Sequence, residues 1–114
     1  MTPVKKADLT IKQTQALEAI RRQALQTLPV EQIILYGSAA RGAMDSESDI
    51  DLLILTRTAL TRDERHQITH LVFRVNLEYD TNFSTLVIPL AAWETGIYSV
   101  LPIHRQIADE GVAV

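Results

Sequence analysis

The sequence predicts an α/β sandwich, a small mixed β-sheet with helices packed on one face, and three observations predict it. Segments in which apolar residues recur at helical spacing alternate with short apolar runs of strand length. The chain has 114 residues, of which 46% are hydrophobic, and this suits one domain with one core. No repeat, low-complexity tract or linker divides the chain. We therefore expect a single domain over residues 1–114.

The first predicted elements are a helix and a strand. The helix is expected from Asp8 or Thr10 to Thr27, and Pro29 ends it because proline cannot continue a helix. The apolar stripe of this helix consists of Leu17, Ile20, Ala24 and Leu28. An apolar run over residues 32–36 predicts the first strand.

A second strand, a long helix and a third strand follow. The second strand is expected over residues 49–55 and the helix over residues 62–79. The apolar stripe of this helix consists of Ile68, Leu71, Val72 and Val75. The third strand is expected over residues 81–88, where Pro89 stops it.

The C-terminal part of the chain predicts shorter elements. One helical turn is expected over residues 90–95 and a short helix over residues 102–109, after which residues 112–114 form a strand or a docked tail. Apolar residues here exceed the need of a small core and predict a docking patch for a partner. The residues of this patch are Trp93, Ile97, Tyr98, Val100 and Leu101.

Two aspartates stand at the start of the second predicted strand. Side chains of a strand point alternately to opposite faces, so Asp49 and Asp51 share one face, with Cα atoms roughly 6.5 Å apart. Carboxylates this close repel each other unless a cation lies between them. The pair therefore indicates a site for a hard divalent metal, and the alternative is the solvated face of an edge strand.

The first predicted strand ends at Gly37 and Ser38. Glycine lets the backbone approach a ligand closely, and exposed N–H groups together with a serine hydroxyl favour an anion such as phosphate. Arg41 follows, and its guanidinium either binds phosphate oxygens or pairs with Asp45 or Glu47. A phosphate site followed by a cation site is typical of phosphoryl or nucleotidyl transfer with magnesium.

These residues carry a family resemblance. Gly37-Ser38, Arg41-Gly42 and Ser48-Asp49-Ile50-Asp51-Leu52 resemble the Gly-Ser…Asp-x-Asp signature of the DNA polymerase beta-like nucleotidyltransferase superfamily. The short chain resembles the minimal nucleotidyltransferases that form one small domain. The resemblance implies the nucleotidyltransferase fold and Mg²⁺ as the cofactor. It further implies metal ligands at Asp49 and Asp51 and nucleotide binding by Gly37, Ser38, Arg41 and Ser48.

The resemblance also implies a third carboxylate on a later strand beside the pair. Aligned by pattern, that position holds Asn82, whose amide oxygen can bind a metal but brings no charge and cannot act as a base. Asp80 lies two residues earlier, on the same face of the expected strand, and is the candidate for a third catalytic residue beside Asp49 and Asp51. The alternative is that Asp80 only caps the turn after the helix.

Composition restricts the partners and the location. The net charge is −3 and the basic residues are scattered, so nucleic acid is disfavoured as the acceptor. The chain has no cysteine, which excludes disulfides and thiolate metal sites and suits a reducing cytosol. Because the N-terminus lacks the apolar segment of a signal peptide and no apolar run has membrane-spanning length, we expect a cytoplasmic protein with no membrane contact.

Two functional interpretations follow from the resemblance. The first is an enzyme that binds a nucleoside triphosphate, expected to be ATP, and transfers AMP to a hydroxyl of a protein partner. Minimal nucleotidyltransferases of this kind are often antitoxins paired with a small helical HEPN-type toxin. The second, favoured by the lack of an evident third aspartate, is a module that neutralises a helical partner by binding alone. The acceptor, the base preference and a homo-oligomeric state stay open.

Overall fold

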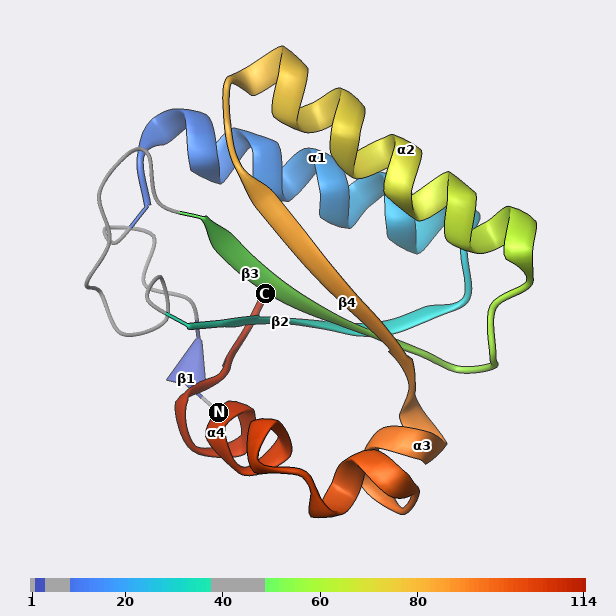
Figure 1. Cartoon of the computed structure of the whole chain (residues 1–114). Coiled ribbons are helices and arrows are strands. Elements are labelled where there is room, and N and C mark those ends of the chain that lie inside the picture. Colours follow the sequence, from blue (N-terminus) through green and yellow to red (C-terminus); the bar gives the residue numbers. More distant parts are fainter. Residues whose placement is uncertain (1, 4–8, 38–48) are drawn as a thin grey trace.

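The structure is a computed structural model that describes residues 2–3, 9–37 and 49–114 (Figure 1). Its centre is a five-stranded mixed sheet in the order β1-β5-β2-β3-β4. The strands are β1 (Thr2–Pro3), β2 (Val30–Tyr36), β3 (Ile50–Thr56), β4 (Phe83–Pro89) and β5 (Val112–Ala113). β2 pairs antiparallel with β3 and with β5, whereas β3 pairs parallel with β4, and β1 with β5. β3 therefore lies inside the sheet and β4 lies at its edge.

Two long helices, α1 (Ile11–Thr27) and α2 (Arg62–Tyr79), lie over one face of the sheet (Figure 1). Both begin with a capping box, in which a threonine and the residue three positions later exchange hydrogen bonds. The partners are Thr10 with Gln13 and Thr61 with Glu64. Among the helices of the described ranges, none has both the length and the apolar character that crossing a membrane requires.

The core beneath α1 and α2 contains the apolar stripes that the sequence predicts. Alternate residues of β3, Ile50, Leu52 and Ile54, are fully buried on this face. The helices contribute the predicted residues, which are Leu17, Ile20 and Ala24 of α1 and Ile68, Leu71, Val72 and Val75 of α2. Helical spacing in the helices and alternation in the strand were sufficient to identify this layer, and that prediction is confirmed.

A second layer covers part of the opposite face. It consists of α3 (Leu90–Glu94), the 3₁₀ helix η2 (Ile97–Val100) and α4 (Pro102–Glu110) (Figure 1). Trp93 of α3 and Ile107 of α4 are buried against Leu53 and Leu55 of β3. The α/β class and the mixed sheet are confirmed. Cover on the second face was not expected, because the spacing of short apolar segments does not show which face of a sheet they reach.

The second layer divides the predicted docking patch. The Trp93 side chain is only 7% exposed, and its ring lies 4.4 Å from that of His104, centroid to centroid. The expectation that Trp93 belongs to an exposed patch is therefore wrong, since its large apolar ring fills the second core. The remaining exposed part lies on and just after η2, where Ile97 is 73% and Val100 is 81% exposed.

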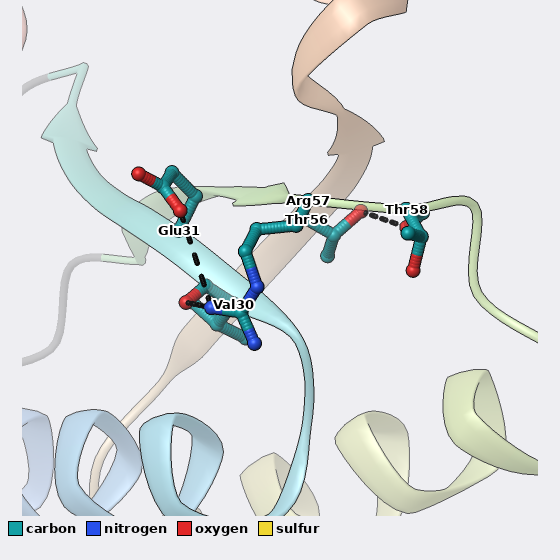
Figure 2. Close-up of polar contacts among 5 residues, drawn as sticks. All are labelled: Val30, Glu31, Thr56, Arg57 and Thr58. Atoms are coloured by element: carbon teal, nitrogen blue, oxygen red, sulfur yellow. Dashed lines mark hydrogen bonds and ion pairs between the residues drawn. The ribbon is translucent and has the colours of Figure 1, made fainter.

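Arg57 anchors the end of the β2–β3 pair that lies farthest from the aspartates. Its backbone N–H donates to the Pro29 carbonyl at 2.8 Å, and its Nη1 donates to the Val30 carbonyl at 3.2 Å. The same guanidinium lies 4.0 Å from a Glu31 carboxylate oxygen (Figure 2). The ladder is irregular between Val30 and Gln32 and regular from there onward. These bonds hold the irregular end, so the rest of the pair keeps one register.

Replacing Trp93 by alanine tests whether the second layer is a true core. We expect Trp93→Ala to lower the free energy of unfolding by about 3–5 kcal/mol, because it removes a large buried ring and leaves a cavity. Urea denaturation measures the change. The matched control is Ile97→Ala, which alters an exposed residue of the same predicted patch and should stay within about 0.5 kcal/mol. Equal, small effects of both substitutions would contradict the second core.

Candidate functional site

The two aspartates lie where β3 begins. Asp51 is the second residue of β3 and is partly buried, whereas Asp49 directly precedes the strand and is exposed. Asp51 shares its face of β3 with Leu53 and Leu55, so it points away from α1 and α2 as predicted. The second layer of helices covers the two leucines and leaves Asp51 partly accessible. A carboxylate is therefore held at the margin of an apolar core.

Gly37 follows β2 directly beside Asp51. The Cα of Tyr36, the last residue of β2, pairs with that of Asp51. Gly37 has a φ of +77°, in the left-handed region that glycine adopts without strain. A Cβ at this position would lie 2.6 Å from Oδ2 of Asp51. The backbone conformation favours glycine here, and an added Cβ would displace the Asp51 carboxylate. This close approach joins the predicted phosphate segment to the predicted metal site.

The electrostatics of the site show an excess of negative charge. Burial raises the pKa of Asp51 above its ordinary 3.8, and the charge of Asp49 raises it further. Burial also raises the pKa of the Tyr36 hydroxyl above 10.0, with the charge of Asp51 as the smaller cause. Each added negative charge is therefore disfavoured on this face, and a cation bound between the aspartates would reverse that effect.

β4 supplies further neighbours of Asp51. In the parallel β3–β4 pair, the Cα of Asp51 lies opposite that of Ser84, and Ile50 lies opposite Phe83. The backbone N–H of Ile50 donates to the carbonyl of Asn82 at 2.9 Å. Ser84 is exposed and stands on the same sheet face as Asp51. Ser84 is thus the β4 residue opposite Asp51, and it lies two residues after Asn82 in the chain.

Asp80 does not stand on the strand. β4 begins at Phe83, whereas the sequence predicted a strand from residue 81. Asp80 is the C-cap of α2, with φ 55° and ψ 55°, and its N–H donates to the carbonyl of Asn76. The alternative interpretation, that Asp80 caps the turn after the helix, is the one the structure shows. The expected position of Asp80 on the strand face of Asp49 and Asp51 is wrong, because β4 begins two residues later than predicted. Its catalytic role stays a prediction.

A cavity of about 750 Å³ lies beside the start of β4. Asp80, Thr81 and Asn82 line it from one side and residues 10–13, including Lys12, from the other. A cavity of about 790 Å³ lies along α1. Neither cavity has Asp49 or Asp51 among its described lining residues. The cavity beside β4 reaches Asn82, whose carbonyl accepts from the N–H of Ile50, the residue between the two aspartates.

Three predicted nucleotide-binding residues, Ser38, Arg41 and Ser48, lie outside the described residues. Within the described ranges, no group of three or more His, Cys, Asp or Glu side chains is arranged to hold a metal ion. Two carboxylates nevertheless fit Mg²⁺, which is commonly bound through one or two carboxylates, with water and substrate phosphates completing its coordination.

Sequence reasoning missed Ser84 and the place of Tyr36. Tyr36 packs against the second core, and its Cα also pairs with that of Asp51, which no sequence pattern indicated. The sequence did not single out Ser84, because the register between two parallel strands joined by a helix cannot be read from the sequence of either strand. The available signal was the alternation of Phe83, which is buried, with Ser84, which is exposed.

Comparison with known proteins is consistent with this geometry. A family model described as a nucleotidyltransferase domain matches residues 17–110. A protein of Methanocaldococcus jannaschii, provisionally named a protein adenylyltransferase, is 40% identical over 58 residues. That match spans 51% of this chain and 59% of the relative, so this chain corresponds to little more than half of its length.

Solved structures share the fold. A chain from a toxin–antitoxin complex with AMP-PNP has a TM-score of 0.59 and 15% identity, over 91% of this chain and 72% of that one. A chain from a mutant MntA–HpeT toxin–antitoxin complex has a TM-score of 0.56 and 16% identity, over 92% and 72%. A third, from a complex of tri-AMPylated Shewanella oneidensis HEPN toxin with MNT antitoxin, has a TM-score of 0.52 and 15% identity, over 90% and 71%. Likeness at these identities shows the fold alone, and it confirms the predicted fold.

The raised pKa of Asp51 makes stability depend on pH. Since the folded state holds this proton more tightly than the unfolded chain, ionisation of Asp51 destabilises the fold. We expect Asp51→Asn to raise the melting temperature at pH 7 without divalent metal, and to lose this advantage below the unfolded pKa of 3.8. Calorimetric scans between pH 3 and pH 7 measure it. Asp63→Asn, at the start of α2, is the control, and a lower melting temperature of Asp51→Asn at pH 7 would show that the carboxylate supports the fold.

The register of β4 predicts where a third carboxylate would act. We expect Ser84→Asp to tighten Mg²⁺ binding about 30-fold, since a charge about 4 Å from a divalent ion contributes on the order of 2 kcal/mol even in water. Asn82→Asp is the comparison, because pattern alignment of the sequence places the third carboxylate there. Titration calorimetry with Mg²⁺ decides between them. If only Asn82→Asp binds Mg²⁺ more tightly, the third carboxylate position is residue 82 and not residue 84, which the observed strand pairing indicates.

Proposed function

Because the chain belongs to the nucleotidyltransferase domain family, we propose that it is a magnesium-dependent nucleotidyltransferase that transfers AMP from ATP to a hydroxyl of a protein partner. The observation that carries the proposal is Asp51, held against Gly37 and beside Asp49 at the margin of the second core. Two carboxylates next to the end of a predicted phosphate-binding strand suit a metal–nucleotide complex. The partner is proposed to be a helical HEPN-type toxin, with this chain as its antitoxin.

Several relatives support the finer parts of this proposal. The Methanocaldococcus protein is named for adenylyl transfer to protein. One structural neighbour was solved with AMP-PNP and another contains an AMPylated HEPN toxin. These properties belong to those proteins, and we extend them to this chain on the shared family and fold. ATP is a cytosolic substrate, so the same proposal gives the protein a cytoplasmic location.

The residues divide the work of transfer as follows. The acceptor oxygen attacks the α-phosphorus of ATP, one P–O bond forms, and the bond to the bridging oxygen breaks to release pyrophosphate. Asp49 and Asp51 would hold Mg²⁺, which would supply charge neutralisation at the phosphate oxygens. Gly37, which has no Cβ, leaves room for the Asp51 carboxylate. The proton of the hydroxyl passes to a nearby carboxylate or to water.

A second function is favoured by one observation. The β4 residue opposite Asp51 is Ser84, and the residue that pattern alignment places at the third carboxylate position is Asn82. Neither Ser84 nor Asn82 supplies a carboxylate. A site with two carboxylates can bind metal–nucleotide and still lack a base for the acceptor. In this case the chain neutralises its partner through complex formation. The exposed residues Ile97 and Val100 of η2 are the apolar surface proposed for that contact.

Intact-protein mass spectrometry separates the two functions. The chain is incubated with ATP, Mg²⁺ and the helical protein that copurifies with it from the native host. We expect the partner to gain the mass of one or more AMP units, because the metal site activates the α-phosphate. The gain should fall below detection with Asp49→Asn combined with Asp51→Asn, which removes both carboxylates and keeps the side-chain volumes.

The other outcomes of the mass-spectrometry experiment also distinguish the two functions. A stable complex without any mass gain, in the presence of ATP and Mg²⁺, would support the binding module and reject transfer. Undiminished transfer by the double asparagine variant would place the chemistry elsewhere. Titration calorimetry with ATP provides the independent check, since the proposed site predicts tighter binding with Mg²⁺ than with EDTA.

A further inference from the structure

The connection between α2 and β4 is held by one side chain, that of Asn76. Its Nδ2 donates to the carbonyl of Phe83 at 3.0 Å, and its Oδ1 accepts from the N–H of Phe83 at 2.8 Å. The same Oδ1 accepts from the Thr81 hydroxyl at 3.1 Å. An asparagine amide that bonds both backbone groups of another residue imitates a strand partner, and it fixes the position of that residue.

The backbone of Asn76 completes the connection. Its carbonyl accepts from the N–H of Asp80, which ends the helix, and from the N–H of Thr81 at 3.1 Å. Asp80 adopts the left-handed conformation that turns the chain from the helix toward the strand. The turn that leads into β4 is therefore tied to a single residue of α2, three residues before the helix ends.

This connection determines how β4 meets β3. β4 is the edge strand, and β3 is its sole strand partner in the described part of the sheet. The pairing begins with the bond from the Ile50 N–H to the Asn82 carbonyl, between Thr81 and Phe83, which Asn76 holds. Ile50 itself stands between Asp49 and Asp51 in the chain. The contacts of Asn76 thus lie within one residue of the point where β4 reaches the aspartates.

We propose that Asn76 is a positioning residue of the site, which sets Asn82 and Ser84 of β4 against Asp51 without touching metal or nucleotide. The inference rests on the proposed metal–nucleotide site. An edge strand paired on one side slips or frays more readily than an inner strand, and a shift by one residue turns each side chain to the other face. Asn76 prevents that shift where the site needs Ser84 on the face of Asp51.

The identity of the residue follows from its bonds. Alanine would lose all three bonds, whereas aspartate would replace the donor by a carboxylate oxygen that the Phe83 carbonyl repels. Asn76→Asp therefore provides a second disruptive variant, of the same size as asparagine, that tests the same contact. Thr61→Ala is the matched control, because it removes a hydrogen-bonding side chain from the cap at the other end of the same helix.

The experiment combines a structural and a functional measurement on the full chain. Amide hydrogen exchange by NMR reports the Ile50 and Phe83 N–H groups, and titration calorimetry reports binding of ATP with Mg²⁺. We expect Asn76→Ala to speed exchange at both amides and to weaken Mg²⁺-dependent ATP binding by about 10–100-fold, the range typical of residues that orient metal ligands. Asn76→Asp should change both measurements in the same direction as Asn76→Ala, because its carboxylate cannot donate to the Phe83 carbonyl. Thr61→Ala should lower the melting temperature while leaving both measurements within about twofold of the unmodified chain.

Other results overturn the inference in distinguishable ways. If Asn76→Ala and Thr61→Ala weaken binding equally, Asn76 serves overall stability and the positioning role is rejected. If binding is unchanged while Ile50 exchanges faster, the β4 register does not serve the site, and the inference fails although the proposed function stands. If the unmodified chain shows no Mg²⁺-dependent binding of ATP, the proposed function and the inference fail together.

Discussion

The burial of β3 on both of its faces is the constraint on which the rest of the structure depends. Ile50, Leu52 and Ile54 pack beneath α1 and α2, while Leu53 and Leu55 pack against the C-terminal helices. Such a strand supplies much of the hydrophobic free energy of a small domain. Asp51 is the charged exception within β3, and it stands where the second layer of cover stops. The site is accordingly the point at which the core becomes accessible to ligand.

The position of Asp51 at the margin of the core disfavours its charged form, and this explains why a cation would be favourable there. Partial burial and the neighbouring charge of Asp49 both raise the pKa of Asp51, so the fold disfavours the ionised form of this carboxyl. A divalent metal between the aspartates would favour the ionised form and attract phosphate oxygens to the same place. Natural sites commonly give up stability for function in this way. Gly37 serves the same end, since any side chain there would collide with the carboxylate.

The contrast between Asp80 and Ser84 shows which features of the site a local sequence pattern can predict and which it cannot. Asp80 and Asn82 had the right spacing for one strand face, but Asp80 is the C-cap of α2 and β4 begins only at Phe83. A helix end and a strand start compete for the same residues, and the tertiary contacts of Asn76 decide the boundary. Ser84 carries no charge and stands in no motif. Its place beside Asp51 arises from pairing between segments that are far apart in the chain.

The sequence by itself determined the α/β class, the two long helices with their buried stripes, and two closely spaced aspartates at the start of a strand, where Asp49 precedes the strand and Asp51 lies within it. Each of these depends on spacing within one segment, which side-chain periodicity and backbone sterics decide locally. Tertiary structure alone decided that the second face is partly covered and that Ser84 is level with Asp51. Register and layer order are relations between distant segments, and they are settled only when those segments pack together.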